Sequence, residues 1–317
     1  MSIKPELEVS ASTVQAIVDG VFAGRAITHV TRIHGGEIAA VYQINFAGTH
    51  APAILKVYPD SLHWKMRKEA NMLALVEGRL SVAAPRVLLA DDSKRLLALN
   101  FILMSKLEGT LLGNRGLEPV LTSRQLNSAY LQIGQLLREF HRISMTAFGY
   151  IGADGIMKEH ATNRAYLTFQ FERKLKEFGE RGGAAGLARE VAAAAARSAN
   201  LLDQCTQPVL CHNDLHAGNL TAEITNGNVR LTGVLDFEGT LSGDPLMDVA
   251  KAIYYLPEET RRAVIEGYGD TSRRHWRQTL DLYHLYFVLE LWCWMAQIGN
   301  LKAIDGLTAD LERAARM

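Results

Sequence analysis

One stretch in the second half of the chain alternates short apolar runs with polar residues, and it limits the possible folds more than any other feature. The apolar run 209–211 is typical of a short buried strand, and Asp214 follows its end. A second apolar run, 229–235, is followed at once by Asp236. Between the runs, the segment 225–228 reads Thr-Asn-Gly-Asn and predicts a hairpin turn, because Asn and Gly tolerate positive φ. We therefore expect a strand-turn-strand unit that gathers polar side chains at one edge.

Three polar residues of this unit form a chemically meaningful set: Asp214, Asn219 and Asp236. Carboxylate and amide oxygens suit Mg²⁺. Phosphoryl transfer needs an acidic residue that orients or deprotonates the attacking hydroxyl, and further oxygen ligands that hold metal on the phosphates. Taken singly, Asp214 can cap a helix, Asn219 can be an ordinary loop residue and Asp236 can form an Asx turn. Taken together, they favour Asp214 as the catalytic residue and Asn219 and Asp236 as metal ligands.

The order of these residues also carries a family resemblance. The pattern H-x-D-x-x-x-x-N from His212 to Asn219, followed by D-F-E at 236–238, resembles the catalytic and metal-binding loops of the protein-kinase-like superfamily. The next stretch, G-D-P-L-M-D at 243–248, resembles its small-molecule branch, the aminoglycoside phosphotransferase and choline kinase families. The resemblance implies that His212 orients the catalytic loop and that Asp248 braces its backbone.

The resemblance also implies an α+β fold with two lobes. Residues 1–104 would form an N-lobe that binds nucleotide, with a five-stranded antiparallel sheet and one helix. Residues 105–317 would form a mainly helical C-lobe with a catalytic β-hairpin and the acceptor pocket. Apolar runs and turn residues agree with this order and predict strands at 27–33, 38–46, 53–58, 84–90 and 95–104, with a helix at 64–75. Helical periodicity then predicts helices at 123–142, 161–180, 186–202, 247–256, 258–268 and 272–300.

Lys56 interrupts the apolar strand A-I-L-K-V-Y, which is costly unless its ammonium finds a partner. An edge lysine that reaches solvent is one interpretation. Its context is similar to the V-A-I-K strand of kinases, and the resemblance implies that Lys56 binds phosphate and pairs with Glu69 of the following helix. Lys65 and Lys68 can instead satisfy Glu69 locally.

Further residues are expected around the nucleotide. Gly35 and Gly36 separate two expected strands and would let backbone N–H groups approach phosphate. The segment where the sequence changes from apolar to mixed resembles the family's hinge, so Met104, Ser105 and Leu107 are expected around the adenine ring. The chain has no G-x-G-x-x-G and no G-x-x-x-x-G-K-[ST], so dinucleotide-binding and Walker-type sites have no support.

Four residues are candidates for contact with the acceptor. Glu238 and Asp244 follow Asp236 closely and can either meet an amine or cap loops. Glu290 and Trp292 lie in the aromatic last helix, where they can line a cationic pocket or simply pack in the core. His216 is interpreted as a loop residue rather than a ligand.

The expected activity is ATP- and Mg²⁺-dependent phosphorylation of a small-molecule hydroxyl, with GTP not excluded. The resemblance ranks an aminoglycoside-like or other amine-bearing acceptor first, and choline, ethanolamine or another metabolite second. A protein kinase is disfavoured because Asn213 replaces the Arg of H-R-D and no A-P-E follows D-F-E. A non-catalytic nucleotide-binding protein on the same fold would be expected to lack one of the key residues, yet Lys56, Asp214, Asn219 and Asp236 are all present.

Composition limits the partners. The chain has 34 basic and 34 acidic residues and a net charge of zero, so nothing suggests nucleic-acid binding. Its 3 cysteines are an odd number without metal-ligand spacing and are typical of a reducing compartment. No run is apolar for long enough to span a membrane and the start has no signal-peptide character, so we expect a cytoplasmic protein. The pattern specifies no oligomeric state.

Overall fold

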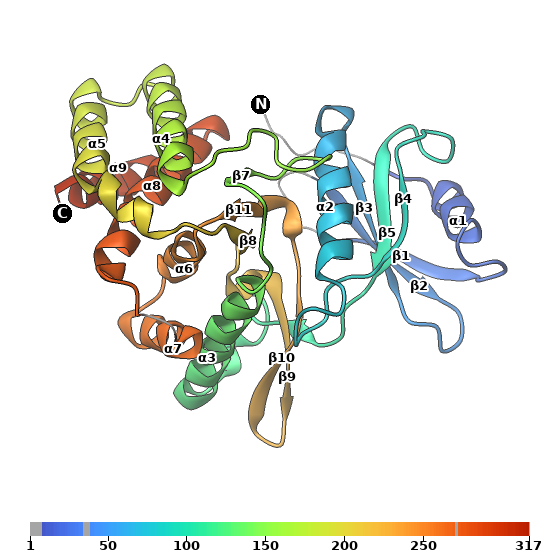
Figure 1. Ribbon diagram of the computed structural model, residues 1–317. Helices are drawn as coiled ribbons and strands as arrows, with labels where there is room; N and C mark the ends of the chain where they lie inside the picture. Colours follow the sequence, from blue (N-terminus) through green and yellow to red (C-terminus); the bar gives the residue numbers. More distant parts are fainter. Residues whose placement is uncertain (1–7, 34–38, 270–271, 317) are drawn as a thin grey trace.

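The computed structural model describes residues 8–33, 39–269 and 272–316. The first third of the chain forms a five-stranded antiparallel sheet in the order β1-β2-β3-β5-β4. Most of the helices gather on the other side of the molecule (Figure 1). The α+β, kinase-like fold expected from the sequence is thereby confirmed. The strands of the sheet are β1 (Ile27–Ile33), β2 (Ala40–Phe46), β3 (Ala53–Tyr58), β4 (Val87–Asp91) and β5 (Asn100–Ser105).

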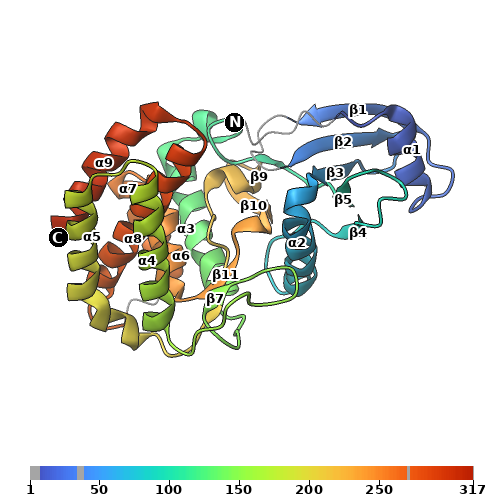
Figure 2. The ribbon, with the colours of Figure 1, turned by 90° about the horizontal axis from the view of Figure 1, so that it is seen from above.

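Two helices cover the sheet. Strand β2 alternates buried and half-buried residues, as expected for a strand between two different environments. Helix α1 (Ala11–Asp19) buries Val14, Ile17 and Val18 in the same core cluster as Ile44. Helix α2 (His63–Val76) lies on the side that faces the helical part of the molecule, as the two ribbon views show (Figures 1 and 2). Helix α2 is therefore the element through which the sheet meets the catalytic segments.

The helical part contains α3 to α9 and a core continuous with the inner side of the sheet. Helix α3 begins with a capping box in which Thr122 and Gln125 satisfy each other's backbone N–H groups. The expected last helix is shorter than predicted, because Gly299 has a positive φ and breaks it. A further helix, α9, follows that the sequence analysis did not identify. The bounds are α3 (Ser123–Phe140), α4 (Asn163–Glu180), α5 (Ala185–Ser198), α6 (Pro245–Ile253), α7 (Glu258–Tyr268), α8 (Trp276–Gln297) and α9 (Leu301–Arg316).

Two small sheets carry the catalytic segments, and they correct one prediction. The hairpin is made by β9 (Leu220–Thr225) and β10 (Asn228–Val234), and the run before Asp214 is not part of it. That run is β8 (Val209–Cys211), which pairs with β11 (Leu241–Gly243) in another sheet. The hairpin expected between the two apolar runs is thus present, but its first strand is the intervening segment L-T-A-E-I-T. The remaining short elements are β6 (Thr110–Leu111), β7 (Gly149–Tyr150) and the 3-10 turns Asp60–Leu62, Glu118–Val120, Ala199–Gln204, Ala217–Asn219 and Phe237–Gly239.

A membrane-spanning helix was not expected from the sequence. Within the described ranges, none of the helices combines the length and the apolar character that a bilayer crossing requires.

Candidate active site

The catalytic loop leaves β8 at His212 and is held by one carboxylate from α6. Asp248 accepts hydrogen bonds from the backbone N–H groups of His212, at 2.7 Å, and Asn213, at 2.8 Å. Asn213 has φ +59°, a left-handed conformation that is uncommon outside glycine. Asp248 is buried, and burial alone would raise its pKa, but its interactions with His141 and the backbone N–H of Asn213 outweigh this effect and lower it. A charged carboxylate therefore fixes the backbone turn that presents Asp214.

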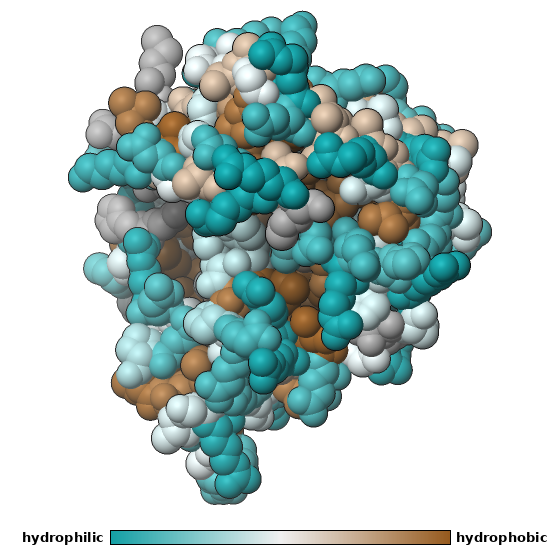
Figure 3. Space-filling view, turned by 90° about the vertical axis from the view of Figure 1, so that its left-hand side faces the viewer, coloured by the Kyte–Doolittle hydropathy of each residue, from teal (hydrophilic) through white to brown (hydrophobic). Residues whose placement is uncertain are grey.

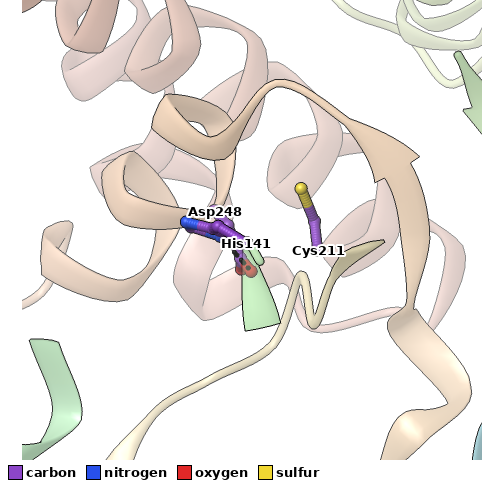
Figure 4. A group of neighbouring side chains, drawn as sticks. All are labelled: His141, Cys211 and Asp248. Atoms are coloured by element: carbon purple, nitrogen blue, oxygen red, sulfur yellow. Dashed lines mark hydrogen bonds and ion pairs between the residues drawn. The ribbon is translucent and has the colours of Figure 1, made fainter. Parts of the chain in front are cut away.

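Asp248 also belongs to the group His141, Cys211 and Asp248, whose ligand-type atoms lie within 4.8 Å of one another (Figure 4). A metal there would have to displace the two backbone N–H groups that Asp248 already binds. Burial also raises the pKa of Cys211 well above its usual value, which keeps it a thiol. We therefore assign this group a structural role.

His212 connects the catalytic loop to the segment that carries Asp236. Its side chain is fully buried, and Nε2 lies 3.0 Å from the carbonyl oxygen of Leu235, to which it donates. The ring packs edge-on against Phe140, with the centroids 5.4 Å apart. Burial lowers the pKa of His212 despite the nearby carboxylates, so the imidazole is neutral. This geometry gives His212 an orienting position and leaves it no solvent contact for proton transfer.

Asp214, Asn219 and Asp236 are brought to one place. The Asn219 side-chain amide donates to the Asp214 backbone oxygen at 2.9 Å and to its Oδ2 at 3.1 Å. The Leu235 N–H donates to the Asn219 backbone oxygen at 2.8 Å, which fixes Asp236 beside Asn219. The side chains of Asp214 and Asp236 are each 44% exposed. Two carboxylates accessible to a ligand thus flank an asparagine whose nitrogen is already engaged.

This arrangement fits a divalent cation. Because Nδ2 of Asn219 is bound to Asp214, its Oδ1 is the atom left for a metal. Burial would raise the pKa of Asp236, but the Lys56 ammonium, helped by a backbone hydrogen bond from Glu238, lowers it overall, so the carboxylate is charged. Asp236 has φ +63°, a strained conformation for a residue with a side chain, at the point where the chain leaves β10. Such hard oxygen atoms are the ligands that Mg²⁺ prefers.

Lys56 lies at the centre of a buried charge cluster. Its Nζ is 2.9 Å from Glu69 Oε2, 2.7 Å from Glu238 Oε1 and 3.7 Å from Asp236 Oδ1. Tyr58 also donates a hydrogen bond to Glu69. Burial alone would lower the pKa of Lys56, but Glu238 and Glu69 raise it well above its ordinary value. The ammonium is therefore charged and held beside the candidate metal ligands, and Glu69 reaches it from α2.

Glu238 is placed differently from what the sequence suggested. It was considered as a partner for the acceptor's amine, yet it is 7% exposed and pairs with Lys56 and, at 3.7 Å, with Lys65. It follows Asp236 in a turn that folds back toward the sheet, which explains why it faces Lys56. Glu238 thus lies beside Lys56, on the side where the sequence predicts nucleotide binding.

Lys68 was considered from the sequence only as a local partner for Glu69, but in the structure its side chain contacts other groups. Its side chain is fully buried, and Nζ donates to the Thr240 carbonyl oxygen at 2.7 Å. The same Nζ lies 3.8 Å from the centroid of the Tyr150 ring, whose hydroxyl donates to the Glu238 carbonyl oxygen. Burial, with a contribution from Lys65, lowers the pKa of Lys68 to about 7. Helix α2 is therefore joined to the segment after Asp236 by a buried lysine, for which the described part of the chain shows no carboxylate in direct contact. No pattern in the sequence signals this contact.

The expected hinge residues lie at the end of β5. Met104 is buried and pairs with Ile54 of β3. The Ser105 N–H donates to the Arg86 carbonyl oxygen at 2.9 Å, so this group is engaged within the protein. Leu107 is half-buried beside Gly233, where an added Cβ would come within 2.5 Å of the Leu107 side chain. Contact of this segment with an adenine ring stays a prediction.

Gly35 and Gly36 lie outside the described residues.

Asp244 and Trp292, expected as possible acceptor contacts, are both buried and bound to other residues of the protein. Asp244 is fully buried, caps α6 by accepting from Leu246 N–H, and pairs with Arg273 at 2.7 Å. The Trp292 indole N–H donates to Thr308 at 2.9 Å, and its ring packs on Phe178 in the core. The capping and packing alternatives therefore describe these two residues better than substrate contact does.

A cavity of about 530 Å³ lies directly beside Asp214. It is bounded by the catalytic loop, the first half of α3, the end of α6 and the start of α7. On the face shown in Figure 3, hydrophobic residues lie in hollows among hydrophilic side chains. Glu290 does not line the cavity itself. Its carboxylate lies 3.3 Å from Nζ of Lys251, which does line the cavity. The lining residues Glu118, Lys251 and Tyr255 were not predicted from the sequence, because they come from distant segments and follow no motif. Phe287, which also lines the cavity, belongs to the aromatic last helix, for which a cationic pocket was one of the two expectations.

Comparisons with known proteins agree with this geometry. Residues 29–282 match the model of the phosphotransferase enzyme family. The comparison with curated proteins finds no significant match. A solved complex of APH(2")-IIia with GDP and kanamycin has a TM-score of 0.70 and 16% identity, covering 95% of this chain and 97% of that one.

Two further solved structures are similar over nearly their whole length. A thermostable mutant of aminoglycoside phosphotransferase APH(4)-Ia with AMP-PNP and hygromycin B has a TM-score of 0.71 and 18% identity, covering 96% of this chain and 98% of that one. A putative fructosamine-3-kinase from Haemophilus somnus has a TM-score of 0.67 and 17% identity, covering 96% of this chain and 97% of that one. Since the family model spans well over half of the sequence, the chain belongs to the phosphotransferase enzyme family.

Proposed function

We propose that this enzyme transfers the γ-phosphoryl group of Mg²⁺-ATP to a hydroxyl group of a small, amine-bearing acceptor. One observation carries the proposal: Asp214 lines the cavity on one side and is bonded on the other to Asn219, beside Asp236 and Lys56. An acceptor hydroxyl in the cavity and a phosphate beside Lys56 would therefore meet at Asp214.

Each side chain then has a defined task. Lys56, fixed by Glu69 and Glu238, binds phosphate oxygens of the nucleotide. The Oδ1 atom of Asn219 and the carboxylate of Asp236 hold Mg²⁺, which when bound neutralises charge on the phosphates.

Asp214 orients the acceptor hydroxyl and takes its proton as the hydroxyl oxygen attacks the γ-phosphorus. The bond from that phosphorus to the bridging oxygen breaks, and ADP leaves with the electron pair. His212 and Asp248 take no part in proton transfer and keep the loop in position.

Two acceptor classes are supported by different observations. Kanamycin and hygromycin B in the similar solved structures favour an aminoglycoside-like acceptor. The apolar lining of the cavity, with Tyr255 and Phe287, favours a smaller amino alcohol of the choline or ethanolamine kind, or another metabolite. The similar structures hold GDP in one case and AMP-PNP in another, so GTP is the alternative phosphate donor.

The test is ADP or GDP release with Mg²⁺ and each nucleotide, across aminoglycosides, choline, ethanolamine, homoserine and free sugars. Acceptor-dependent release is expected with one class. Asp214→Ala should reduce kcat by about 10²–10⁴-fold while ATP still raises the melting temperature. Wild-type turnover in Asp214→Ala would refute the role given to Asp214. Asp236→Ala should weaken Mg²⁺-ATP binding itself, and unchanged binding would refute that assignment.

A further inference from the structure

The cavity beside Asp214 is lined mainly by apolar and aromatic groups. Leu126 and Ile133 come from α3, Leu256 and Pro257 from the turn before α7, and Tyr255 and Phe287 supply two rings. Tyr255 is 68% exposed, so its ring lies at the surface, where a ligand can cover it. A volume of about 530 Å³ falls within the range of pockets that hold drug-sized molecules. The shape and lining suit a ligand with a sizeable apolar body.

The charges of the lining are few. Among the described residues that form it, the acidic side chains are Asp214 and Glu118 and the basic one is Lys251, apart from His216. Glu118 accepts a hydrogen bond from Tyr130 at 2.6 Å, which fixes its carboxylate. Lys251 lies 3.3 Å from Glu290 and 5.0 Å from the centroid of the Phe287 ring. One fixed carboxylate besides the catalytic residue can pair with one ammonium group.

A compound with several ammonium groups is poorly matched to this lining. Each further ammonium would have to lose water against apolar walls or approach Lys251, and a desolvated charge without a partner is costly. An aromatic pair can instead cover alkyl or ring carbons and face a single cation.

We propose that the acceptor is an amphipathic amino alcohol, with one ammonium group for Glu118, one hydroxyl for Asp214 and an apolar body that covers Tyr255 and Phe287. This inference rests on the proposed phosphotransfer and names the acceptor class of the same site. It predicts that kcat/KM rises with the apolar area of the acceptor and falls with additional positive charges.

The test uses a graded series: ethanolamine, N-butylethanolamine, N-hexylethanolamine, N-octylethanolamine and N-benzylethanolamine, with kanamycin as the polycation. ADP release gives kcat/KM, and calorimetric titration of the enzyme with each compound gives binding without turnover. We expect kcat/KM to rise by about two- to fourfold for each methylene that the cavity covers. The longer compounds should exceed kanamycin.

Variants separate the apolar wall from the carboxylate. Tyr255→Ser should flatten the dependence on chain length, and Glu118→Gln should reduce kcat/KM for every amine by about tenfold. Leu301→Ser is the matched control, because Leu301 is 74% exposed and is not part of the cavity lining. It should keep the wild-type dependence.

The outcomes distinguish this inference from the proposed reaction. Turnover of kanamycin with no dependence on chain length would overturn the inference and leave phosphotransfer standing. Graded binding without ADP release would support the acceptor class and overturn the reaction. No binding of any series member, or a Tyr255→Ser variant with an unchanged slope, would overturn the inference.

Discussion

The surroundings of Asp214 differ on its two sides: charged side chains lie on one side, and mainly apolar side chains lie on the other. On the nucleotide side, Lys56 is surrounded by Glu69, Glu238 and Asp236, and its side chain is 13% exposed. On the acceptor side, the cavity is apolar, and exposed Tyr255 lies on its wall. The nucleotide side is thus a network of buried ion pairs that depend on one another, whereas the acceptor side consists of separate apolar contacts.

This difference has a consequence for substitution. Removing one member of a buried ion-pair network leaves its partner unpaired in a medium that solvates charge poorly. Substitutions there should therefore lower the stability of the protein strongly. An apolar wall residue at the surface can change with little effect on folding. Substitutions around Lys56, where we propose that phosphate binds, should therefore cost more than substitutions in the wall of the proposed acceptor cavity. The following substitutions test that contrast.

The largest effect is expected for Arg273→Ala, which removes the guanidinium that pairs with Asp244 at 2.7 Å. Asp244 is fully buried, and leaving its charge unpaired should lower the free energy of unfolding by about 3–5 kcal/mol. Urea denaturation measures this loss. At a temperature where the variant is still folded, the KM for the acceptor should match the wild type. If the variant instead raises the acceptor KM without a loss of stability, Asp244 contacts the acceptor.

Glu238→Gln is expected to have the next largest effect, and to be confined to the nucleotide side. It removes one of the two carboxylates within 3 Å of Lys56, and a hydrogen bond to a charged group contributes about 1.5–3 kcal/mol. The KM for ATP should rise by roughly 10- to 100-fold, and the acceptor KM should stay near wild type. Steady-state kinetics with each substrate varied in turn makes the comparison. If the acceptor KM rises instead, Glu238 contacts the amine, as the sequence had first suggested.

Local patterns in the sequence predicted most of the elements and the three polar residues that the structure brings together beside the cavity. The strands β1, β2 and β3 follow from alternating apolar residues, and Asp214, Asn219 and Asp236 follow from their fixed spacing. The pairing of β10 with β9 was missed because L-T-A-E-I-T carries a weaker apolar signal than the run before Asp214. Strand pairing depends on which segments meet in space, and neighbouring runs in the sequence do not decide it.

The residues that the sequence did not reveal are those defined by distant contacts. Lys68 meets Thr240, a contact that no pattern in the sequence signals. Its neighbour Glu69 on the same helix meets Lys56, as the family resemblance implied, and helical spacing alone predicts neither partner. The shape of the cavity wall could not be predicted from the sequence either, because Glu118 and Phe287 are brought together only by the packing of distant segments.

Lys68→Met tests whether burial of the lysine lowers the free energy of unfolding. Lys68 has a pKa of about 7 in the folded state and 10.5 ordinarily, so between these pH values the unfolded chain binds more protons. Its contribution to stability is therefore present above pH 10.5 and is lost as the pH falls through 7, with a slope of up to about 1.4 kcal/mol per pH unit. The methionine variant should lack this slope.

Chemical denaturation at pH 7, 8 and 9 measures the difference in the free energy of unfolding between wild type and Lys68→Met. The wild type should gain stability relative to the variant as the pH rises. Lys176→Met is the control, because the Lys176 side chain is 78% exposed, and its difference from wild type should not change with pH. A constant difference for Lys68→Met would mean that the ammonium keeps its proton throughout this range.

The smallest effect is expected for His216→Ala, on the acceptor side of the loop. His216 Nε2 lies 3.8 Å from Asp214 Oδ2, and the two side chains are 54% and 44% exposed, so water screens the pair. Nδ1 of His216 accepts from the Gly218 N–H at an exposed position, where water can replace it. The expected loss in kcat/KM is less than about threefold, measured with the preferred acceptor at pH 6 and pH 8. A tenfold loss, or a changed ratio between the two pH values, would show that His216 contacts the substrate. The acceptor side would then contain a polar contact to the substrate as well as an apolar wall.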